Sequence, residues 1–249
     1  MPSPLTGNVP IVALRARIDA VRARVADAAR AAGRDPRGVR VLLATKTQDA
    51  ATVLAAVEAA WDGERPVLLG ENRVQELTAK APALAGLVAD GRVETHLIGH
   101  LQRNKVNAAL ATASCVQTVD SLALAAALAS RCERDGRVLD VMVQVNVSGE
   151  PTKAGVGPHE APHLACEVAA LAGLRLTGLM TIGARSDDAA LVSAGFARLR
   201  AIRDDVVASG APGTAQAREL SMGMTGDLEL AVAQGATIVR VGTAVFGPR

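Results

Sequence analysis

The sequence predicts an α/β protein that folds as a single-domain (β/α)₈ TIM barrel with one extra helix at its N-terminus. The chain has 249 residues, close to the roughly 250 residues typical of such barrels. It contains eight short apolar runs; a helix-like stretch follows each of the first seven, and the last leads into a short GTAVFG segment. Strands buried on both faces of a parallel sheet read as continuous apolar runs, and helices cover that sheet. An open, doubly wound sheet is the alternative, although it usually needs fewer strands at this length.

The first element is an amphipathic helix over residues 11–33. Its apolar residues recur at helical spacing and form one stripe, with arginines opposite. Gly33 and the Asp35-Pro36 pair are typical of a helix end. The stripe consists of Ile11, Leu14, Ile18, Val21 and Val25.

The remaining elements alternate between strand and helix. Strands are expected at 41–46, 66–70, 95–99, 115–119, 139–147, 174–181, 218–223 and 237–242. Helices are expected near 48–60, 73–89, 104–111, 121–134, 158–172, 187–209 and 225–234. The Gly- and Pro-rich stretch 149–158 is expected to be a loop, so we expect residues 1–249 to form one domain.

Composition excludes several classes of protein. The net charge of +2 and the 1% of aromatic residues argue against nucleic-acid binding. No window approaches the roughly 20 apolar residues of a membrane span. The N-terminal segment has no signal-peptide pattern. Three widely spaced cysteines, Cys115, Cys132 and Cys166, suggest reduced thiols. We therefore expect a cytoplasmic protein, and we expect it to be a monomer.

Polar residues gather where the predicted strands end, which is where barrel enzymes place their sites. Only four basic residues are lysines, and one of them, Lys46, ends an apolar run. Period-two alternation puts Lys46 and Arg240 on the inward faces of the first and last strands. Two buried cations would be costly without an anion. The alternative is that Lys46 extends to the rim and Arg240 pairs with Glu219.

A phosphate group would supply that anion. Hydroxyls and small residues follow the last two strands, at the usual phosphate site of a barrel: Ser221, Gly223, Gly242 and Thr243. A lysine beside a phosphate site, with an arginine available to a ring nitrogen, is the arrangement that binds pyridoxal 5′-phosphate (PLP). A barrel that binds another phosphorylated metabolite without covalent chemistry remains open.

Six segments strengthen the PLP interpretation: LLATKTQ, GENRVQE, HLIGHLQRNKV, VQVNVSGEPTKAGV, LTGLMTIGA and LSMGMTGDLELAVAQGATIVRVGTAVFG. In this order, from about residue 10 to 247, the chain resembles the pyridoxal phosphate homeostasis protein family (YggS/PROSC type). That family is related to the N-terminal barrel of alanine racemase. The resemblance implies a protein that holds PLP as a Schiff base and buffers or delivers it to PLP-dependent apoenzymes, with little or no turnover.

The resemblance also implies roles for particular residues. Lys46 is implied as the Schiff-base lysine and Arg240 as the partner of the pyridine nitrogen. Ser221, Gly242 and Thr243 are implied as phosphate binders, and Asn72, His100 and Met222 as pocket residues. Two positions depart from the family. Arg73 stands where the family often has tyrosine, and Arg103 where it often has a small polar residue.

A PLP-dependent amino-acid racemase is the alternative function. It would need a second base, and the chain has no tyrosine.

Two other patterns are set aside. The segment 159–163 matches the HExxH zinc pattern, but Pro162 lies between its histidines and disrupts a regular helix. Glu71 and Glu76 flank a helix start, where the helix dipole explains them, so they receive no catalytic role.

Overall fold

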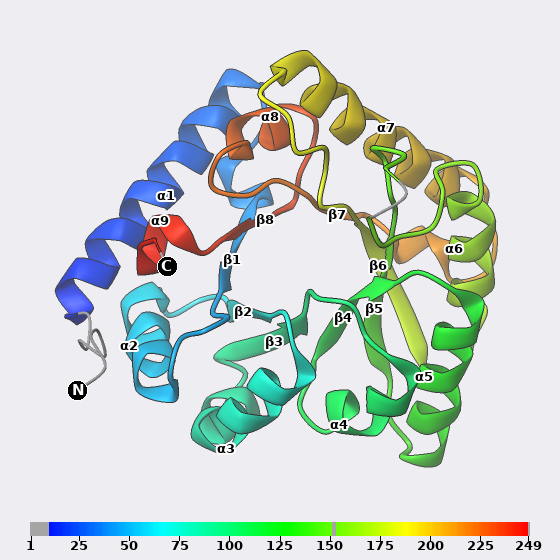
Figure 1. The fold of residues 1–249 in the computed structure, drawn as a ribbon, viewed down its shortest axis with the longest axis horizontal. Coiled ribbons are helices and arrows are strands. Elements are labelled where there is room, and N and C mark those ends of the chain that lie inside the picture. The colour runs from blue at the N-terminus through cyan, green and yellow to red at the C-terminus, as the bar shows by residue number, and fades with distance from the viewer. Residues whose placement is uncertain (1–9, 151–152, 249) are drawn as a thin grey trace.

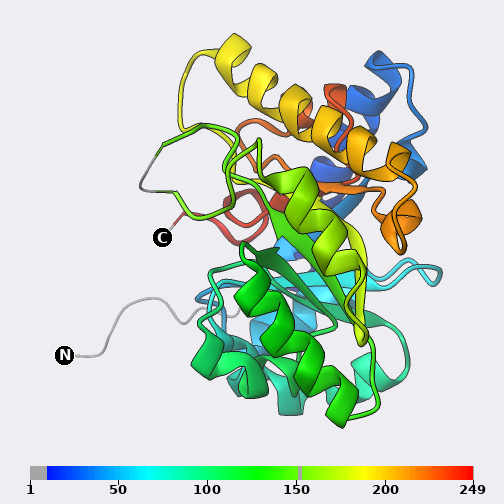
Figure 2. The same ribbon diagram turned by 90° about the vertical axis from the view of Figure 1, so that its right-hand side faces the viewer.

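The computed structural model describes residues 10–150 and 153–248. Its eight strands are all parallel and close into a barrel in the order β1 to β8. Helices surround the barrel (Figures 1 and 2). The predicted fold class is therefore confirmed. The predictions about the N-terminal segment concern residues 1–9, which lie outside the described residues.

The strands are β1 (Arg40–Ala44), β2 (Val67–Glu71), β3 (Val93–Leu97), β4 (Cys115–Val119), β5 (Leu139–Gln144), β6 (Leu174–Met180), β7 (Glu219–Ser221) and β8 (Ile238–Val241). The helices are α1 (Ile11–Ala31), α2 (Ala50–Ala60), α3 (Val74–Ala89), α4 (Val106–Leu110), α5 (Leu122–Arg134), α6 (Ala161–Ala169), α7 (Ala189–Ala208), α8 (Leu228–Ala233) and α9 (Thr243–Phe246). Short 3₁₀ helices are η1 (Pro36–Gly38), η2 (Arg103–Lys105) and η3 (Thr214–Gln216).

The extra N-terminal helix α1 lies against α2, α8 and α9, outside the point where β1 and β8 close the barrel (Figure 1). The predicted stripe forms its buried face, apart from Ile11, which is exposed at the helix start. Several later helices begin at a side-chain cap. Asp49, Ser121 and Asp188 each accept a hydrogen bond from a backbone N–H of the first turn.

Two apolar clusters fill the molecule. The larger one lies between the strands and the helices and includes Val239 and Val241 of β8. The smaller one lies inside the barrel and consists of Leu42, Leu68, Cys115, Met142, Met180 and Ile238. This division confirms the alternation predicted for the last strand, with Ile238 and Arg240 facing inward.

Some element bounds differ from the sequence prediction. β1 ends at Ala44, so Lys46 lies in the turn that follows instead of ending the strand. The turn is required because Thr47 has a positive φ of 69°, which no strand residue adopts. β7 is limited to three residues because Gly223 turns the chain with a φ of 88°. Among the described residues, no helix is both long and apolar enough to cross a membrane.

Candidate functional site

Lys46 lies at the carboxyl-end mouth of the barrel, where it is half-buried. Contacts on both sides fix the turn that carries it. The Thr45 backbone N–H donates to the Gly70 carbonyl at 2.9 Å. The Thr47 backbone N–H donates to a Glu76 carboxylate oxygen at 3.1 Å. Because each neighbour of Lys46 is tied to β2 or α3, the structure holds the lysine in place through its backbone.

A buried ion pair supports the same turn. The Lys80 ammonium, on α3, lies 2.6 Å from Glu71 Oε1 at the end of β2. It also donates to the Thr45 carbonyl at 2.8 Å, and the Thr45 hydroxyl donates to the same Glu71 oxygen at 2.6 Å. Burial raises the pKa of Glu71 above its usual value, although the bonds from Lys80 and Thr45 oppose this. Glu71 and Glu76 thus position the lysine turn, a role that helix-dipole reasoning did not reveal.

Arg240 points into the barrel, as the alternation predicted, and is 5% exposed. Its Nη1 donates to Ser221 Oγ at 2.9 Å, and its Nη2 donates to the Thr181 carbonyl at 2.7 Å. Both acceptors are uncharged. Within the described residues, no carboxylate lies within ion-pair distance of Arg240, so the alternative pairing with Glu219 is wrong. Glu219 instead accepts a hydrogen bond from Thr237.

The charge of Arg240 is therefore buried without a partner of opposite sign. Burial lowers its pKa to about 10, and Asp227 opposes that effect from a distance. The guanidinium remains protonated at neutral pH. An uncompensated buried cation is costly, and a ligand that brings an acceptor or an anion to this end of the barrel would offset the cost.

Small residues and hydroxyls line the chain after β7 and β8. Gly242 packs so closely on β1 that an added Cβ would lie 3.3 Å from the Ala44 carbonyl oxygen. The Thr243 hydroxyl donates to the Thr225 hydroxyl at 3.3 Å. Thr225, in the turn before α8, was not singled out from the sequence. Because hydroxyl protons rotate, these two adjacent hydroxyls, one from each loop, can turn to donate to a bound phosphate.

Ser221 lies deeper than the sequence suggested. It is fully buried, and its hydroxyl donates to Gln117 Oε1 at 2.6 Å while accepting from Arg240. Gln117 is on β4, across the barrel interior from β7. Gln117 could not be recognised from the sequence, because it lies within an ordinary strand and only its neighbours in the closed barrel make it unusual.

Asn72, His100 and Met222 differ from Arg240 in their surroundings. Asn72 and His100 are exposed near Gly99, where an added Cβ would lie 2.0 Å from the Asn72 carbonyl oxygen. They line a small cavity of about 130 Å³ together with Arg73. His100 Nδ1 lies 3.6 Å from Asp120 Oδ2. Met222 is fully buried in the outer core, so its side chain packs towards the helices.

The HExxH pattern at residues 159–163 does not form a metal site in the structure. α6 begins at Ala161, after the first histidine of the pattern, and has a proline in its first turn. His163 faces Glu167 at 3.6 Å on the same helix. Across residues 10–150 and 153–248, no group of three or more histidine, cysteine or acidic side chains is arranged to hold a metal ion.

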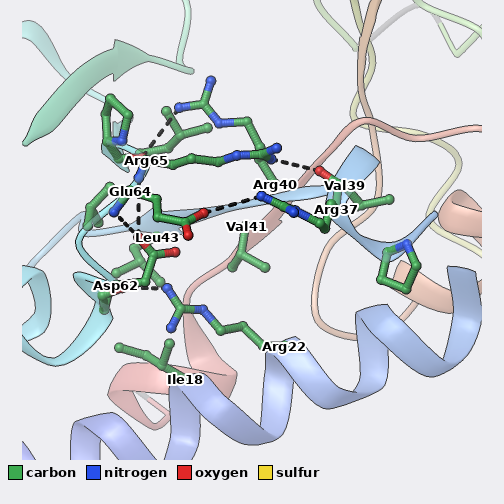
Figure 3. Close-up of a pocket in the computed structure, with 15 residues that line it drawn as sticks. Ile18, Arg22, Arg37, Val39, Arg40, Val41, Leu43, Asp62, Glu64 and Arg65 are labelled. Carbon is green, nitrogen blue, oxygen red and sulfur yellow. Dashed lines mark hydrogen bonds and ion pairs between the residues drawn. The ribbon is translucent and has the colours of Figure 1, made fainter.

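A separate cavity of about 310 Å³ lies between α1, η1 and the starts of β1 and β2 (Figure 3). Several arginines line it, and local contacts hold two of them in place. Arg37 lies 3.3 Å from Glu64, and Arg65 donates to the Arg37 carbonyl at 2.7 Å. Asp62 accepts from the Arg65 backbone N–H at 3.2 Å. This cavity is at the amino ends of the strands, opposite Lys46, and is not part of the candidate site.

Comparisons with known proteins agree with the geometry. Residues 16–249 match the family described as alanine racemase, N-terminal domain. A pyridoxal phosphate homeostasis protein of Pseudomonas aeruginosa is 42% identical over 229 residues, covering 92% of this chain and 93% of the relative. A counterpart of Escherichia coli is 35% identical over 236 residues, covering 92% and 94%. The solved structure of PipY from Synechococcus elongatus with PLP bound has a TM-score of 0.76 and 32% identity, covering 94% of this chain and all of that one. The chain therefore belongs to the alanine racemase N-terminal domain family and, within it, to the pyridoxal phosphate homeostasis proteins.

Proposed function

We propose that this protein binds PLP, holds it as a Schiff base on Lys46, and serves as a carrier or buffer in PLP homeostasis. The observation that carries the proposal is the buried Arg240, whose hydrogen-bond partners in the described chain are neutral. It lies on the same barrel end as the lysine turn and the Thr225–Thr243 pair. The relatives named above support the same conclusion.

The side chains present fit the groups of PLP. The Arg240 guanidinium would donate a hydrogen bond to the pyridine nitrogen of PLP. This nitrogen is a neutral acceptor, so Arg240 can bind it without a carboxylate beside the guanidinium. The phosphate of PLP would be bound by hydroxyl and backbone donors. These donors would come from Gly242, Thr243 and Thr225. We assign Ser221 to the orientation of Arg240, since its hydroxyl is already bonded there. Asn72 and His100 stay proposed pocket residues at the exposed rim. Met222 stays one only through its backbone, because its side chain packs towards the helices.

PLP supplies an aldehyde that condenses reversibly with amines. In the proposed site Lys46 would be the amine that holds this aldehyde, and the contacts of the lysine turn with β2 and α3 would keep that amine at the barrel mouth. A reversible bond of this kind suits storage and release, because a competing amine or water frees the PLP again. Release would deliver it to PLP-dependent apoenzymes, the partners we propose.

The remaining expectations follow from this function. We propose that residues 1–249 form one PLP-binding domain that acts as a monomer in the cytoplasm, with no nucleic-acid partner. The cysteines are free in the structure, with Cys115 and Cys132 buried. Free thiols of this kind are typical of a reducing compartment.

The experiment is borohydride reduction of the PLP-loaded protein, followed by peptide mapping. The visible absorption band is expected to disappear on reduction, and the pyridoxyl label is expected on Lys46. Lys46→Ala is expected to lose the band, whereas Lys105→Ala, a control at the same barrel mouth, is expected to keep it. A label on Lys80, Lys105 or Lys153 in the wild-type protein contradicts the assignment.

A further inference from the structure

A chain of hydrogen bonds crosses the barrel interior from β8 to β3. Arg240 donates to Ser221 Oγ at 2.9 Å, and Ser221 donates to Gln117 Oε1 at 2.6 Å. Gln117 Nε2 lies 2.7 Å from His96 Nδ1. His96 Nε2 lies 3.4 Å from Glu94 Oε2, at the cavity of about 610 Å³ where the strands begin.

The direction of every bond in this chain follows from its first member. A guanidinium only donates, so the Ser221 oxygen accepts and its proton points to Gln117. The amide oxygen of Gln117 is then used, which leaves its NH₂ group to donate to His96 Nδ1. His96 consequently carries its proton on Nε2, facing the Glu94 carboxylate.

Glu94 is suited to end the chain as an acceptor. Burial raises its pKa, but the contacts with His96 and Arg40 outweigh burial and leave the pKa below its usual value. Arg40 lies 3.3 Å from the same carboxylate oxygen. An ionised carboxylate at the far end therefore favours the His96 tautomer that accepts from Gln117.

We propose that Gln117 and His96 are positioning residues for Arg240. They hold the Ser221 proton away from the guanidinium, so that the hydroxyl oxygen stays available as its acceptor and the guanidinium is fixed in one orientation. The link to the cofactor rests on the proposed function, in which Arg240 faces the pyridine nitrogen. The chain itself belongs to the protein without any ligand and is testable there.

The residues in the middle of this hydrogen-bond chain are buried, so breaking one of its bonds is costly. Gln117 and Ser221 are fully buried, and His96 is 4% exposed. In such surroundings a broken bond leaves a polar group without water to replace its partner. One wrong amide orientation at Gln117 would present its NH₂ group to Ser221, whose proton would then lose its acceptor.

The first test uses nitrogen-15 NMR of the imidazole rings in the ligand-free protein. The expected wild-type spectrum has His96 protonated on Nε2 only. Gln117→Glu is nearly isosteric but can only accept, so it is expected to place a proton on His96 Nδ1. Ser221→Ala is expected to alter the His96 signals, although Ser221 does not touch that ring.

Thr95→Val is the matched control for these variants. Thr95 neighbours His96 on β3 but faces outward, and its hydroxyl donates to the Thr112 carbonyl at 2.5 Å. This variant also loses one buried hydrogen bond, yet it is expected to leave the His96 tautomer unchanged. If Gln117→Glu and Ser221→Ala leave the His96 signals as in the wild type, the chain does not operate and the proposal is overturned.

The second test measures PLP binding. Gln117→Leu is expected to weaken PLP binding about 2- to 10-fold, the effect of one misplaced hydrogen bond. It is also expected to shift the visible absorption band, because the band responds to the group that faces the ring nitrogen. Thr95→Val is expected to change neither quantity. Gln117→His, whose ring accepts on one nitrogen and donates from the other, is expected to restore part of the affinity.

The two proposals fail in different ways. If the wild-type protein does not bind PLP, the proposed function is wrong, while the NMR result still decides whether the chain orients Arg240 and His96 together. If the wild type binds PLP and Gln117→Leu matches it in both affinity and spectrum, the positioning role is overturned and the proposed function stands.

Discussion

The Lys80 ammonium lies 2.6 Å from Glu71 Oε1, and both side chains are buried against the turn that carries Lys46. Removing one partner of such a pair leaves the other charge buried alone. Lys80→Met is therefore expected to lower the free energy of unfolding by about 3–5 kcal/mol, measured by urea denaturation. Arg30→Met breaks the exposed Arg30–Asp27 pair and is expected to cost no more than about 1 kcal/mol. Equal costs would show that the buried pair has no special role.

The same pair predicts a pH dependence of stability. Burial raises the pKa of Glu71 in the folded protein above the usual 4.5, so just above that pH the folded state binds more protons than the unfolded state. The contribution of Glu71 to the free energy of unfolding therefore falls as pH rises from the pKa of Glu71 in the unfolded protein to its pKa in the folded protein. Glu71→Gln removes the titration, and its unfolding free energy is expected to lack this fall. A parallel pH profile for the two proteins would contradict the prediction.

The Thr243 hydroxyl is predicted to bind the phosphate of PLP. Thr243→Val replaces it with a methyl group of similar size, and a hydrogen bond to a charged group is worth about 1.5–3 kcal/mol. PLP affinity is expected to fall roughly ten- to a hundredfold, measured by absorption titration. Thr78→Val, in which the lost hydroxyl bonds only to its own helix at Val74, is expected to bind PLP normally. Unchanged affinity in Thr243→Val would place the phosphate elsewhere.

Gly223 is predicted to tolerate no side chain. Its φ is 88°, and an added Cβ would lie 2.4 Å from Ala231 Cβ on α8. Its carbonyl also accepts the Arg240 backbone N–H at 2.9 Å. Gly223→Ala is expected to lose more than about 1 kcal/mol of stability and to weaken PLP binding. Gly226→Ala, which meets no atom within 4 Å, is the control for thermal unfolding and is expected to be nearly neutral.

The protein is predicted to be a poor amino-acid racemase or none. Racemisation works best with bases on both faces of the substrate, and in the proposed site Lys46 would serve only one. Burial raises the pKa of the Cys115 thiol well above its usual value, which makes that thiol a poor second base. In the proposed site Arg240 would stay protonated beside the ring, so the pyridine nitrogen would stay unprotonated and would withdraw electrons weakly.

The measurement is exchange of the α-proton of L-alanine in deuterium oxide, together with the appearance of the D-isomer. Exchange by the PLP-loaded protein is expected to be no faster than exchange by free PLP. Free PLP at the same concentration is the control. Turnover on the order of 10 per second, a typical enzyme rate, would instead establish a racemase.

The sequence by itself determined the barrel and the position of its main charged groups. Alternating apolar runs and helices predicted a parallel sheet covered on its outer face, because most of the strands read as nearly continuous apolar runs. Period-two alternation was enough to place Arg240 inside, since a strand offers only two faces. The lysine turn was located within two residues, although a positive φ at Thr47 moved Lys46 past the strand end.

Only the tertiary structure decided which polar groups meet inside the barrel. Gln117 and Ser221 are 104 residues apart in the chain and come into contact because β4 and β7 face each other across the interior. Lys80 and Thr45 meet for a similar reason, through the packing of α3 against the barrel. A local pattern records the face on which a residue lies, but barrel closure determines its opposite neighbour. The hydrogen bonds that orient Arg240 and the turn of Lys46 therefore arise from the closed fold.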